Sequence, residues 1–477
     1  MDPVTLAHVA HVTGGRLVRA TNADELVGPD VVTDSRVVTP GGLFVAIAGE
    51  RTDGHDHLEQ VRDRGARAAL VTREVAVDLP QIVVADTVAA LAEVARDVVT
   101  RAEVTGLRVV GITGSSGKTS TKDLVAKVLG DAGATIAPPG SFNNEIGAPL
   151  TACRVTSETR FLVSEMGARG RGHITALARI SRPTIGAVLN VGHAHVGEFG
   201  SVEAIAEAKG ELVEALPPQG WAVLNADDPL VSAMASRTTA RRAVFSAEED
   251  PGAEAGALRV WAQEVRPDAL QRHRFELNAA GLVVGRAEVQ LRVLGRHQVS
   301  NALAAAAIAL AAGVGLGEIA ASLSAATAAS RWRMELITRP DGVRILNDAY
   351  NANPDSMRAA LHTLAGMRDG SGRLIAALGD MLELGSSADA EHRALGALAA
   401  ELGIHVLAVG DEGPLIAAGA TDAGGTGEYL ADVNALTNRL RALVRPGDIV
   451  VVKASRGLAL ERVADALAAA TDEGDPA

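Results

Sequence analysis

The sequence predicts an α/β protein of three domains, on three observations. The chain has 477 residues, enough for two to four domains. Short apolar runs rich in Val, Ile and Leu alternate with helical patterns along most of it. A glycine-rich loop joins one such run to a helix. In residues 258–294, by contrast, apolar and polar residues alternate with a period of two. We expect a small N-terminal α/β domain (1–105), a central, mostly parallel sheet with appended antiparallel strands (106–330) and a C-terminal doubly wound domain (331–477).

Composition narrows the class of protein. Hydrophobic residues make up 47% of the chain and aromatics only 2%, so the cores must consist of Ala, Val, Leu and Ile. The net charge is −13 and no basic block occurs, which argues against non-specific nucleic-acid binding. The single cysteine, Cys153, excludes an intramolecular disulfide and is expected in a core. No apolar window is long enough for membrane insertion, so we expect a soluble, cytoplasmic protein.

The N-terminal region shows α/β alternation but no phosphate-binding loop. A polar turn, Thr33-Asp-Ser-Arg36, interrupts it. The patterns predict helices over residues 4–12, 54–64 and 87–101 and strands over residues 43–48, 68–71 and 81–85.

The central region begins with a predicted phosphate-binding loop. Residues 107–110 form a short apolar strand, glycines follow at 111, 114 and 117, and Lys118-Thr119 opens a helix. Bare backbone N–H groups and a helix N-terminus suit an anion, Lys118 adds a positive charge, and the Thr119 hydroxyl suits Mg²⁺. Ile112 stands where the usual Gly-x-x-x-x-Gly-Lys-Thr pattern has its first glycine. The alternative is a glycine-rich turn that only joins strand to helix.

Polar side chains follow the next predicted strands, which cover residues 161–164, 185–189 and 221–224. Glu165 comes directly after the first of these, and His193 and His195 follow the second. The carboxyl ends of parallel strands form the ligand-binding edge of α/β sheets, so Glu165 could hold a metal beside the phosphates. The alternative for each side chain is an ordinary surface loop.

Lys209 has unusual neighbours for a lysine. On the helix expected around it, the adjacent positions are Ile205, Ala206, Leu212 and Val213. Lys209 therefore lies on or beside the apolar stripe. Two interpretations remain open: its ammonium reaches solvent past the stripe, or it is a partly buried lysine with a depressed pKa that is available for reaction.

The C-terminal region has predicted strands at residues 344–346, 374–378, 405–409 and 448–452. Residues 347–356 are dense in hydrogen-bonding groups before a helix, where the alternative is a simple cap by Asp355 or Ser356. The arginines of residues 330–335 could reach phosphates across the domain junction. Lys453 and Arg456 follow the last strand and suit a carboxylate.

Together these stretches resemble one family, the Mur ligases of peptidoglycan synthesis. They occur in the family's order across all three predicted domains, and the stretches that carry the resemblance are the loop at 111–119, Ser141–Gly147, Glu165–Gly167, Asn190–His195, Ala208–Leu212, Gly295–Asn301, Asp348–Asn353 and Lys453–Gly457. The resemblance implies a P-loop ATPase-like central domain, a Rossmann-like C-terminal domain that binds the amine acceptor and an N-terminal domain that binds a UDP-linked substrate.

The resemblance also implies site residues. Catalysis would depend on Lys118, Lys209, His195 and Glu165. ATP would be bound by Gly114, Ser115, Ser116, Gly117, Lys118, Thr119, Ser120, Asn301, Arg333 and Asp348. Substrates would be bound by Thr33, Asp34, Ser35, Arg36, Asn143, Asn144, Tyr350, Asn351, Asn353, Lys453, Ser455 and Arg456. Of two Mg²⁺ ions, Thr119 and Glu165 would hold one, and His195 and a Lys209 carbamate formed from CO₂ would hold the other.

The implied reaction is ATP-dependent amide synthesis through an acyl phosphate by a monomer. The substrates would be UDP-N-acetylmuramoyl-tripeptide and D-Ala-D-Ala, because residues 141–147 and 348–353 favour a dipeptide acceptor. One alternative is a family member that adds a single amino acid. Another is a non-catalytic nucleotide-binding regulator, which would explain the loop but not Lys209 or the C-terminal clusters.

Overall fold

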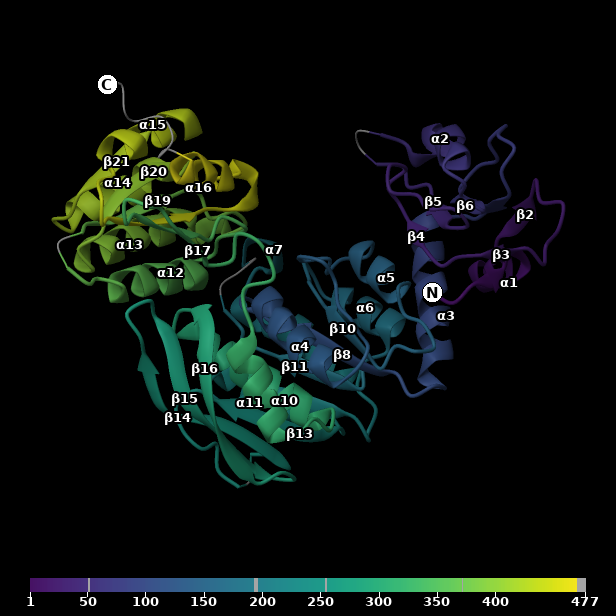
Figure 1. The fold of residues 1–477 in the computed structure, drawn as a ribbon, viewed down its shortest axis with the longest axis horizontal. Helices are drawn as coiled ribbons and strands as arrows, with labels where there is room; N and C mark the ends of the chain where they lie inside the picture. Colours follow the sequence, from purple (N-terminus) through teal and green to yellow (C-terminus); the bar gives the residue numbers. More distant parts are fainter. Residues whose placement is uncertain (50–51, 193–195, 254, 371, 470–477) are drawn as a thin grey trace.

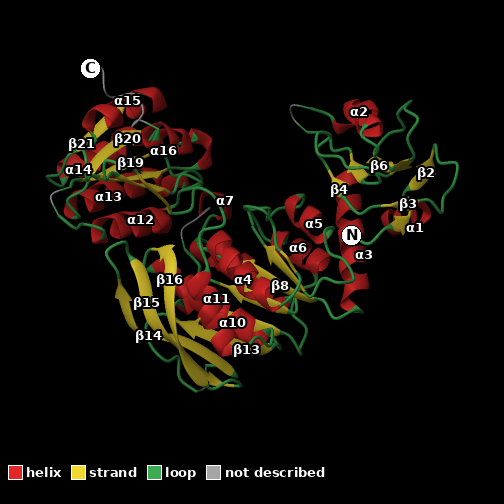
Figure 2. Ribbon diagram, in the orientation of Figure 1, coloured by secondary structure: helices red, strands yellow, loops and turns green. Residues whose placement is uncertain are grey.

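The structure is a computed structural model that describes residues 1–49, 52–192, 196–253, 255–370 and 372–469. Three main β-sheets follow one another along the chain, and helices cover each of them. Figures 1 and 2 show the central sheet and its helices between the N-terminal and C-terminal regions. This arrangement confirms the predicted α/β fold class, while the domain bounds after residues 105 and 330 stay predictions.

The N-terminal sheet has five strands in the order β2-β7-β6-β5-β4, with only β2 antiparallel to its neighbour. The predicted helix at 4–12 begins as a two-residue strand, β1 (Val4–Thr5), because Thr5 caps the helix by accepting from the His8 backbone N–H. The other elements are α1 (Leu6–Thr13), β2 (Arg16–Val18), β3 (Leu26–Val27), β4 (Val31–Val32), β5 (Leu43–Val45), a 3₁₀ turn (Gly54–His57), α2 (Leu58–Asp63), β6 (Ala68–Val71), β7 (Gln81–Val83) and α3 (Thr87–Glu103).

The central sheet has nine strands in the order β16-β15-β14-β13-β12-β11-β8-β10-β9. The strands from β9 to β14 are parallel, and β14, β15 and β16 form the antiparallel extension expected from residues 258–294. Its strands are β8 (Arg108–Thr113), β9 (Thr135–Ile136), β10 (Phe161–Glu165), β11 (Ile185–Val188), β12 (Trp221–Asn225), β13 (Arg241–Ser246), β14 (Leu258–Pro267), β15 (Arg272–Gly281) and β16 (Gly285–Leu294). Its helices are α4 (Lys118–Ala132), α5 (Gly147–Ala152), α6 (His173–Ser181), α7 (Val196–Phe199), α8 (Val202–Glu214), α9 (Pro229–Ala233), α10 (His297–Ala311) and α11 (Leu316–Ala325).

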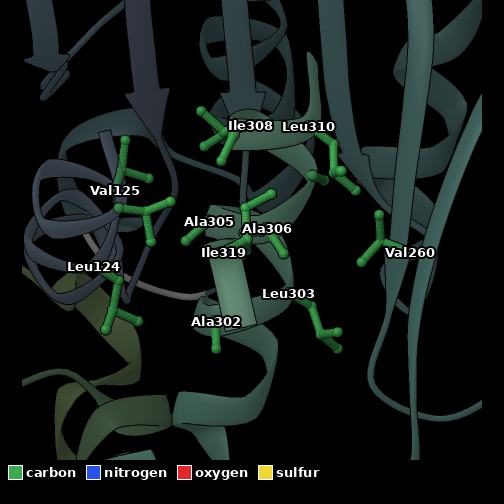
Figure 3. Close-up of a cluster of buried hydrophobic side chains, with 14 of the residues drawn as sticks. Leu124, Val125, Val260, Ala302, Leu303, Ala305, Ala306, Ile308, Leu310 and Ile319 are labelled. Atoms are coloured by element: carbon green, nitrogen blue, oxygen red, sulfur yellow. The ribbon is translucent and has the colours of Figure 1, made fainter. Parts of the chain in front are cut away.

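Helix α10 forms the centre of the largest hydrophobic core. It packs against α4, α11 and strands β13 and β14, and its residues from Ala302 to Ala309 are fully buried. Figure 3 shows Leu124 and Val125 of α4 beside its alanines, with Val260 of β14 on the other side. A helix buried on all sides carries no polar face, which explains the unbroken apolar sequence. Its alanines let α4, and with it the phosphate loop, pack closely.

The C-terminal sheet has the order β17-β18-β22-β19-β20-β21 and is parallel except for β17. Helices cover both faces, as a doubly wound domain requires. Its strands are β17 (Glu335–Thr338), β18 (Arg344–Asn347), β19 (Leu374–Leu378), β20 (His405–Val409), β21 (Gly427–Leu430) and β22 (Ile449–Lys453). Its helices are α12 (Pro354–Gly366), α13 (Ala388–Glu401), α14 (Gly413–Asp422), α15 (Val433–Leu443) and α16 (Glu461–Ala468).

Across the described ranges, none of the helices combines the length and the apolar character needed to cross a lipid bilayer.

Candidate active site

The predicted phosphate loop forms as a strand–loop–helix unit. Strand β8 ends at Thr113 and α4 begins at Lys118. Gly117 has a φ of 78°, and a Cβ atom there would lie 2.6 Å from Asn301 Oδ1, so glycine is required. The Lys118 ammonium donates to the Gly114 carbonyl at 2.6 Å. Burial lowers the pKa of Lys118, the Arg333 charge adds to the lowering, and the Glu165 carboxylate opposes it.

A second loop holds the phosphate loop in place. Asn190 Oδ1 accepts from the Ser116 backbone N–H at 2.9 Å, and its amide donates to the Ser116 carbonyl at 3.2 Å. The Gly192 N–H donates to Ser115 Oγ at 2.9 Å. Asn190 was not among the predicted site residues. Its position two residues after the end of β11, which lies beside β8 in the sheet, is the sequence signal that could have identified it.

Thr119 and Glu165 meet at the carboxyl edge of the sheet, as predicted. Thr119 Oγ1 lies 3.3 Å from Glu165 Oε1, which also accepts from Asn143 Nδ2 at 2.8 Å. Arg333 reaches this group from the C-terminal side, with Nη2 3.2 Å from Thr119 Oγ1 and its guanidinium 4.2 Å from the centre of the Tyr350 ring. Residues from three distant parts of the sequence therefore surround one hydroxyl group.

Two atoms of this network fit a metal–phosphate pair. Glu165 Oε2 and Arg333 Nε are buried and have no hydrogen-bond partner in the described ranges. A buried carboxylate oxygen and a buried guanidinium N–H normally have partners, so the pair is suited to a cation and an anion. No group of three or more His, Cys, Asp or Glu side chains forms a metal cluster among the residues described. Mg²⁺ commonly takes one or two carboxylates together with substrate phosphates, and Thr119 and Glu165 fit that pattern.

Lys209 is buried on α8, so its ammonium does not extend to solvent. Its side chain is 4% exposed, and Ile205, Leu212 and Val213 around it are fully buried. Burial lowers its pKa well below the usual range, and the Lys118 charge adds to this effect. Of the two interpretations of the sequence, the structure supports the buried lysine with a depressed pKa. His195, its predicted partner at the second metal site, lies outside the described residues, as does His193.

A cavity of about 1410 Å³ joins the three regions. Thr33, Asp34, Asn144 and the loop from Ser115 to Thr119 line it, as do Asn143, Glu165, Lys209, Arg333, Tyr350, Asn351, Asn353, Ser455 and Arg456. Most predicted site residues therefore face one space. Ser35 does not line the cavity, because it is buried and donates to Gln60 Oε1 at 2.9 Å. Arg36 also lies off the lining and pairs with Asp34 at 2.8 Å.

Other predicted residues lie behind the cavity wall. Neither Gly114 nor Ser120 lines the cavity. Asn301 is buried under the phosphate loop, where it accepts from Thr121 Oγ1 at 3.2 Å and donates to Gln298 at 2.9 Å. The structure therefore places Asn301 outside the lining of the cavity in which it was predicted to bind ATP. Asn301 Oδ1 instead packs close to Gly117, 2.6 Å from where a Cβ atom would lie.

Lys453 also differs from its prediction as an open charge for a carboxylate. It is 2% exposed, and its ammonium lies 2.6 Å from Asp348 Oδ2 and 2.8 Å from the Asn351 carbonyl. The reason is topological, since β22 lies beside β18 and the two strands end together. Asp348 is occupied in turn, accepting from the Met334 N–H at 3.1 Å. Of the predicted cationic pair only Arg456 lines the cavity.

Comparison with known proteins identifies the family to which this site and fold correspond. Residues 112–309 match the Mur ligase middle domain, residues 332–456 match the Mur ligase glutamate ligase domain, and residues 30–113 match the catalytic domain of the Mur ligase family. A relative from Mycobacterium tuberculosis is 46% identical over 98% of each chain. The chain belongs to the Mur ligase family. That relative is named UDP-N-acetylmuramoyl-tripeptide–D-alanyl-D-alanine ligase, and the resemblance seen in the motifs is confirmed.

Solved structures agree with this Mur ligase over nearly its full length. MurF from Acinetobacter baumannii superposes with a TM-score of 0.85 at 31% identity, covering 98% of this chain and 99% of that one. A MurF ligase from Thermotoga maritima, solved in complex with ADP, has a TM-score of 0.76 at 27% identity and covers 92% and 96%. The arrangement of three sheets around one cavity is therefore a Mur ligase fold.

Proposed function

We propose that this Mur ligase joins D-alanyl-D-alanine to UDP-N-acetylmuramoyl-tripeptide in peptidoglycan precursor synthesis, using ATP and releasing ADP and phosphate. The observation that carries the proposal is the meeting of Lys118, Thr119, Glu165 and Arg333 around one point of a cavity that all three regions line. A full-length relative at 46% identity bears the name of this activity. Because fold alone does not define function, the proposal depends on the site together with that name.

The chemistry requires activation of a carboxylate, which is a poor electrophile. Its oxygen attacks the γ-phosphate of ATP, giving an acyl phosphate and ADP, and the acceptor amine then displaces phosphate to form the amide. Lys118 and Arg333 neutralise the charge that develops on the transferred phosphoryl group. The Thr119 hydroxyl and the Glu165 carboxylate would hold Mg²⁺, which supplies further charge neutralisation when bound. Water must be kept from the acyl phosphate, because it would hydrolyse this intermediate before the amine attacks.

Lys209 is proposed to react with CO₂ rather than to bind phosphate as a cation. A neutral amine adds to CO₂ and loses a proton, which gives a carbamate with hard oxygen atoms suited to a second Mg²⁺. Burial favours the neutral amine, and the side chain lines the cavity. His195 remains a predicted partner at that site. Action as a monomer and a cytoplasmic location also remain predictions.

The C-terminal wall is proposed to receive the acceptor. Tyr350, Asn351, Asn353, Ser455 and Arg456 line it and offer hydrogen-bonding groups. Arg456 pairs with Glu461 at 2.7 Å and lies over the Trp332 ring, so its guanidinium is held at the cavity rim. We assign the acceptor carboxylate to Arg456, because Arg456 lines the cavity whereas Lys453 is buried behind its wall. The uridine end of the other substrate is assigned to Thr33 and Asp34 on the N-terminal wall.

The decisive experiment measures ATP consumption with UDP-N-acetylmuramoyl-tripeptide and a panel of amines. We expect kcat/KM for D-Ala-D-Ala to exceed greatly the values for D-Ala, L-Lys and meso-diaminopimelate. A preference for one of the single amino acids would assign the chain to a ligase that adds one residue. ATP turnover at the same rate with and without each amine would instead indicate a nucleotide-dependent regulator.

A further inference from the structure

Helix α4 carries a buried ion pair one turn beyond the phosphate loop, formed by the adjacent residues Lys122 and Asp123. Lys122 is 2% exposed, and its ammonium lies 2.5 Å from Asp123 Oδ1. Neighbouring side chains on a helix normally point apart, so both must turn toward a common point. Neither residue lines the cavity. The proposed chemistry therefore does not account for a buried charge at this position.

The common point is Ser330, in the middle of the connection of residues 326–334 between α11 and β17. Asp123 Oδ2 accepts from the backbone N–H of Ser330 at 3.0 Å, and the Lys122 ammonium lies 3.5 Å from Ser330 Oγ. The same ammonium donates to the Pro138 carbonyl at 3.1 Å, just before Ser141. The pair thus joins the nucleotide helix to two segments that approach the site from elsewhere in the chain.

The connection returns to the first turn of the same helix. Trp332 and Met334 have φ values of 59° and 52°, an unfavourable backbone conformation for non-glycine residues. Between them, Arg333 Nη2 lies 3.2 Å from Thr119 Oγ1 and 3.4 Å from Ser141 Oγ. The connection is therefore anchored to α4 twice, by Ser330 at Asp123 and by Arg333 at Thr119. The strained Trp332 lies between these two anchors, and the strained Met334 follows the second.

We propose that Lys122 and Asp123 are positioning residues that clamp Ser330 to the nucleotide helix and so bring Arg333 to the phosphates. With Ser330 fixed, rotation of the C-terminal region is confined to Arg331–Met334. The distance from the Arg333 guanidinium to the phosphate loop then varies little as the C-terminal region changes its orientation. Without the clamp the pivot moves toward residue 326, where α11 has ended, and Arg333 samples a wider volume. Lost orientation of this kind lowers the rate of the chemical step more than the affinity for nucleotide.

The test compares Asp123→Ala, Asp123→Asn and Lys122→Met with Lys127→Met in the full chain. Lys127 pairs with Asp131 at 2.6 Å on the same helix but is 40% exposed and its ion-pair partner lies on α4 itself, so it is the matched control. Asp123→Ala should lower kcat about tenfold, the size of one charge-assisted hydrogen bond, while Kd for ADP changes less than twofold. Asp123→Asn, which keeps an acceptor for Ser330, should recover part of kcat. The control should match wild type.

Limited trypsin digestion supplies a readout that does not depend on turnover. Loss of the clamp should speed cleavage after Arg331 and Arg333 several-fold, with other sites unchanged. Wild-type cleavage there together with wild-type kcat would overturn the clamp, and a uniform rise in cleavage at all sites would show a general structural role instead. The kcat readout rests on the proposed ligase reaction, whereas the proteolysis does not. An absence of ligase activity in wild type would therefore refute the proposed function and leave the clamp to be decided by trypsin.

Discussion

Lys209 and Lys453 are both buried lysines near the cavity, but their surroundings are opposite. Lys453 forms an ion pair with Asp348 at 2.6 Å and donates to a carbonyl at 2.8 Å. Lys209 makes no hydrogen bond or ion pair with any residue that the structure describes, and apolar side chains surround it. Burial lowers the pKa of both, yet the Asp348 carboxylate opposes the lowering at Lys453, whereas the Lys118 charge adds to it at Lys209.

The difference separates a structural lysine from a reactive one. A buried cation with a carboxylate and a carbonyl as partners holds the segment that carries them in place, here residues 348–351. A buried amine without a partner is costly to keep charged, so it is available as a neutral nucleophile. Burial alone therefore does not identify a reactive lysine. What separates the two kinds of lysine is whether a partner lies within hydrogen-bonding distance of the ammonium.

The largest expected effect is on stability, and it should have opposite signs at the two lysines. Lys453→Met leaves the buried Asp348 carboxylate without its cationic partner, which typically costs about 3–5 kcal/mol. Lys209→Met in buffer free of CO₂ and Mg²⁺ removes an unpaired buried amine and should be neutral or stabilising. Urea unfolding gives the free energies, and hydrogen exchange of β22 localises the loss. Equal destabilisation by both variants would remove the distinction between the two sites.

Lys118 is expected to behave as a catalytic cation despite its depressed pKa. Its ammonium lies at the loop that faces the cavity, and Glu165 partly compensates its burial. Removing one preorganised charge of this kind costs about 2–4 kcal/mol of transition-state stabilisation, so Lys118→Ala should lower turnover at least about thirtyfold. Steady-state kinetics on a folded variant, verified by circular dichroism, measures this. Near-normal turnover would exclude the loop from the mechanism.

Lys209→Arg distinguishes the carbamate from a simple charge. Arginine keeps a cation but cannot form the carbamate, so Lys209→Arg and Lys209→Ala should both lose about 10- to 100-fold in activity at saturating Mg²⁺. In the wild type, removal of CO₂ should lower activity reversibly, and intact-mass analysis should detect the added mass. An arginine variant as active as wild type would refute the carbamate but not the ligase assignment.

The sequence predicted the elements and residues whose cause is local. The phosphate loop, the strands β6, β8 and β10 and the place of Lys209 on or beside an apolar stripe all follow from patterns within about a dozen residues. Whether the Lys209 ammonium is buried stayed open until the structure placed it. The helix positions around Lys209 are the clearest case, because four neighbours within one turn determine its environment. The short strands β2, β3 and β4 were missed because two or three residues carry no periodic pattern.

Pairings between distant segments could not be predicted in the same way. Lys453 and Asp348 are 105 residues apart, and their ion pair exists only because β22 and β18 are adjacent in the sheet. Asn301 is 180 residues from Thr121, and its position under the phosphate loop depends on the packing of α10 against α4. A polar residue at the end of a strand, such as Glu165, does line the cavity. Whether it faces the cavity or another side chain depends on strand order.

The smallest expected effect concerns His297, which reports on the charge of Lys453. Burial lowers the pKa of His297 from 6.5 to about 4; Asp348 opposes this lowering, and the Lys453 and His273 charges add to it. The folded state therefore binds fewer protons than the unfolded state between these values, and the contribution of His297 to stability, complete above pH 6.5, is lost as the pH falls toward about 4. His297→Gln should flatten this part of the urea-midpoint profile.

The same histidine reports on Lys453. In Lys453→Met the Lys453 charge no longer offsets the Asp348 charge, so the His297 pKa, followed by NMR titration, should rise, whereas Lys209→Met should leave the His297 pKa unchanged. A His297 pKa that is the same in both variants would show that Lys453 and Asp348 do not act on it as a pair.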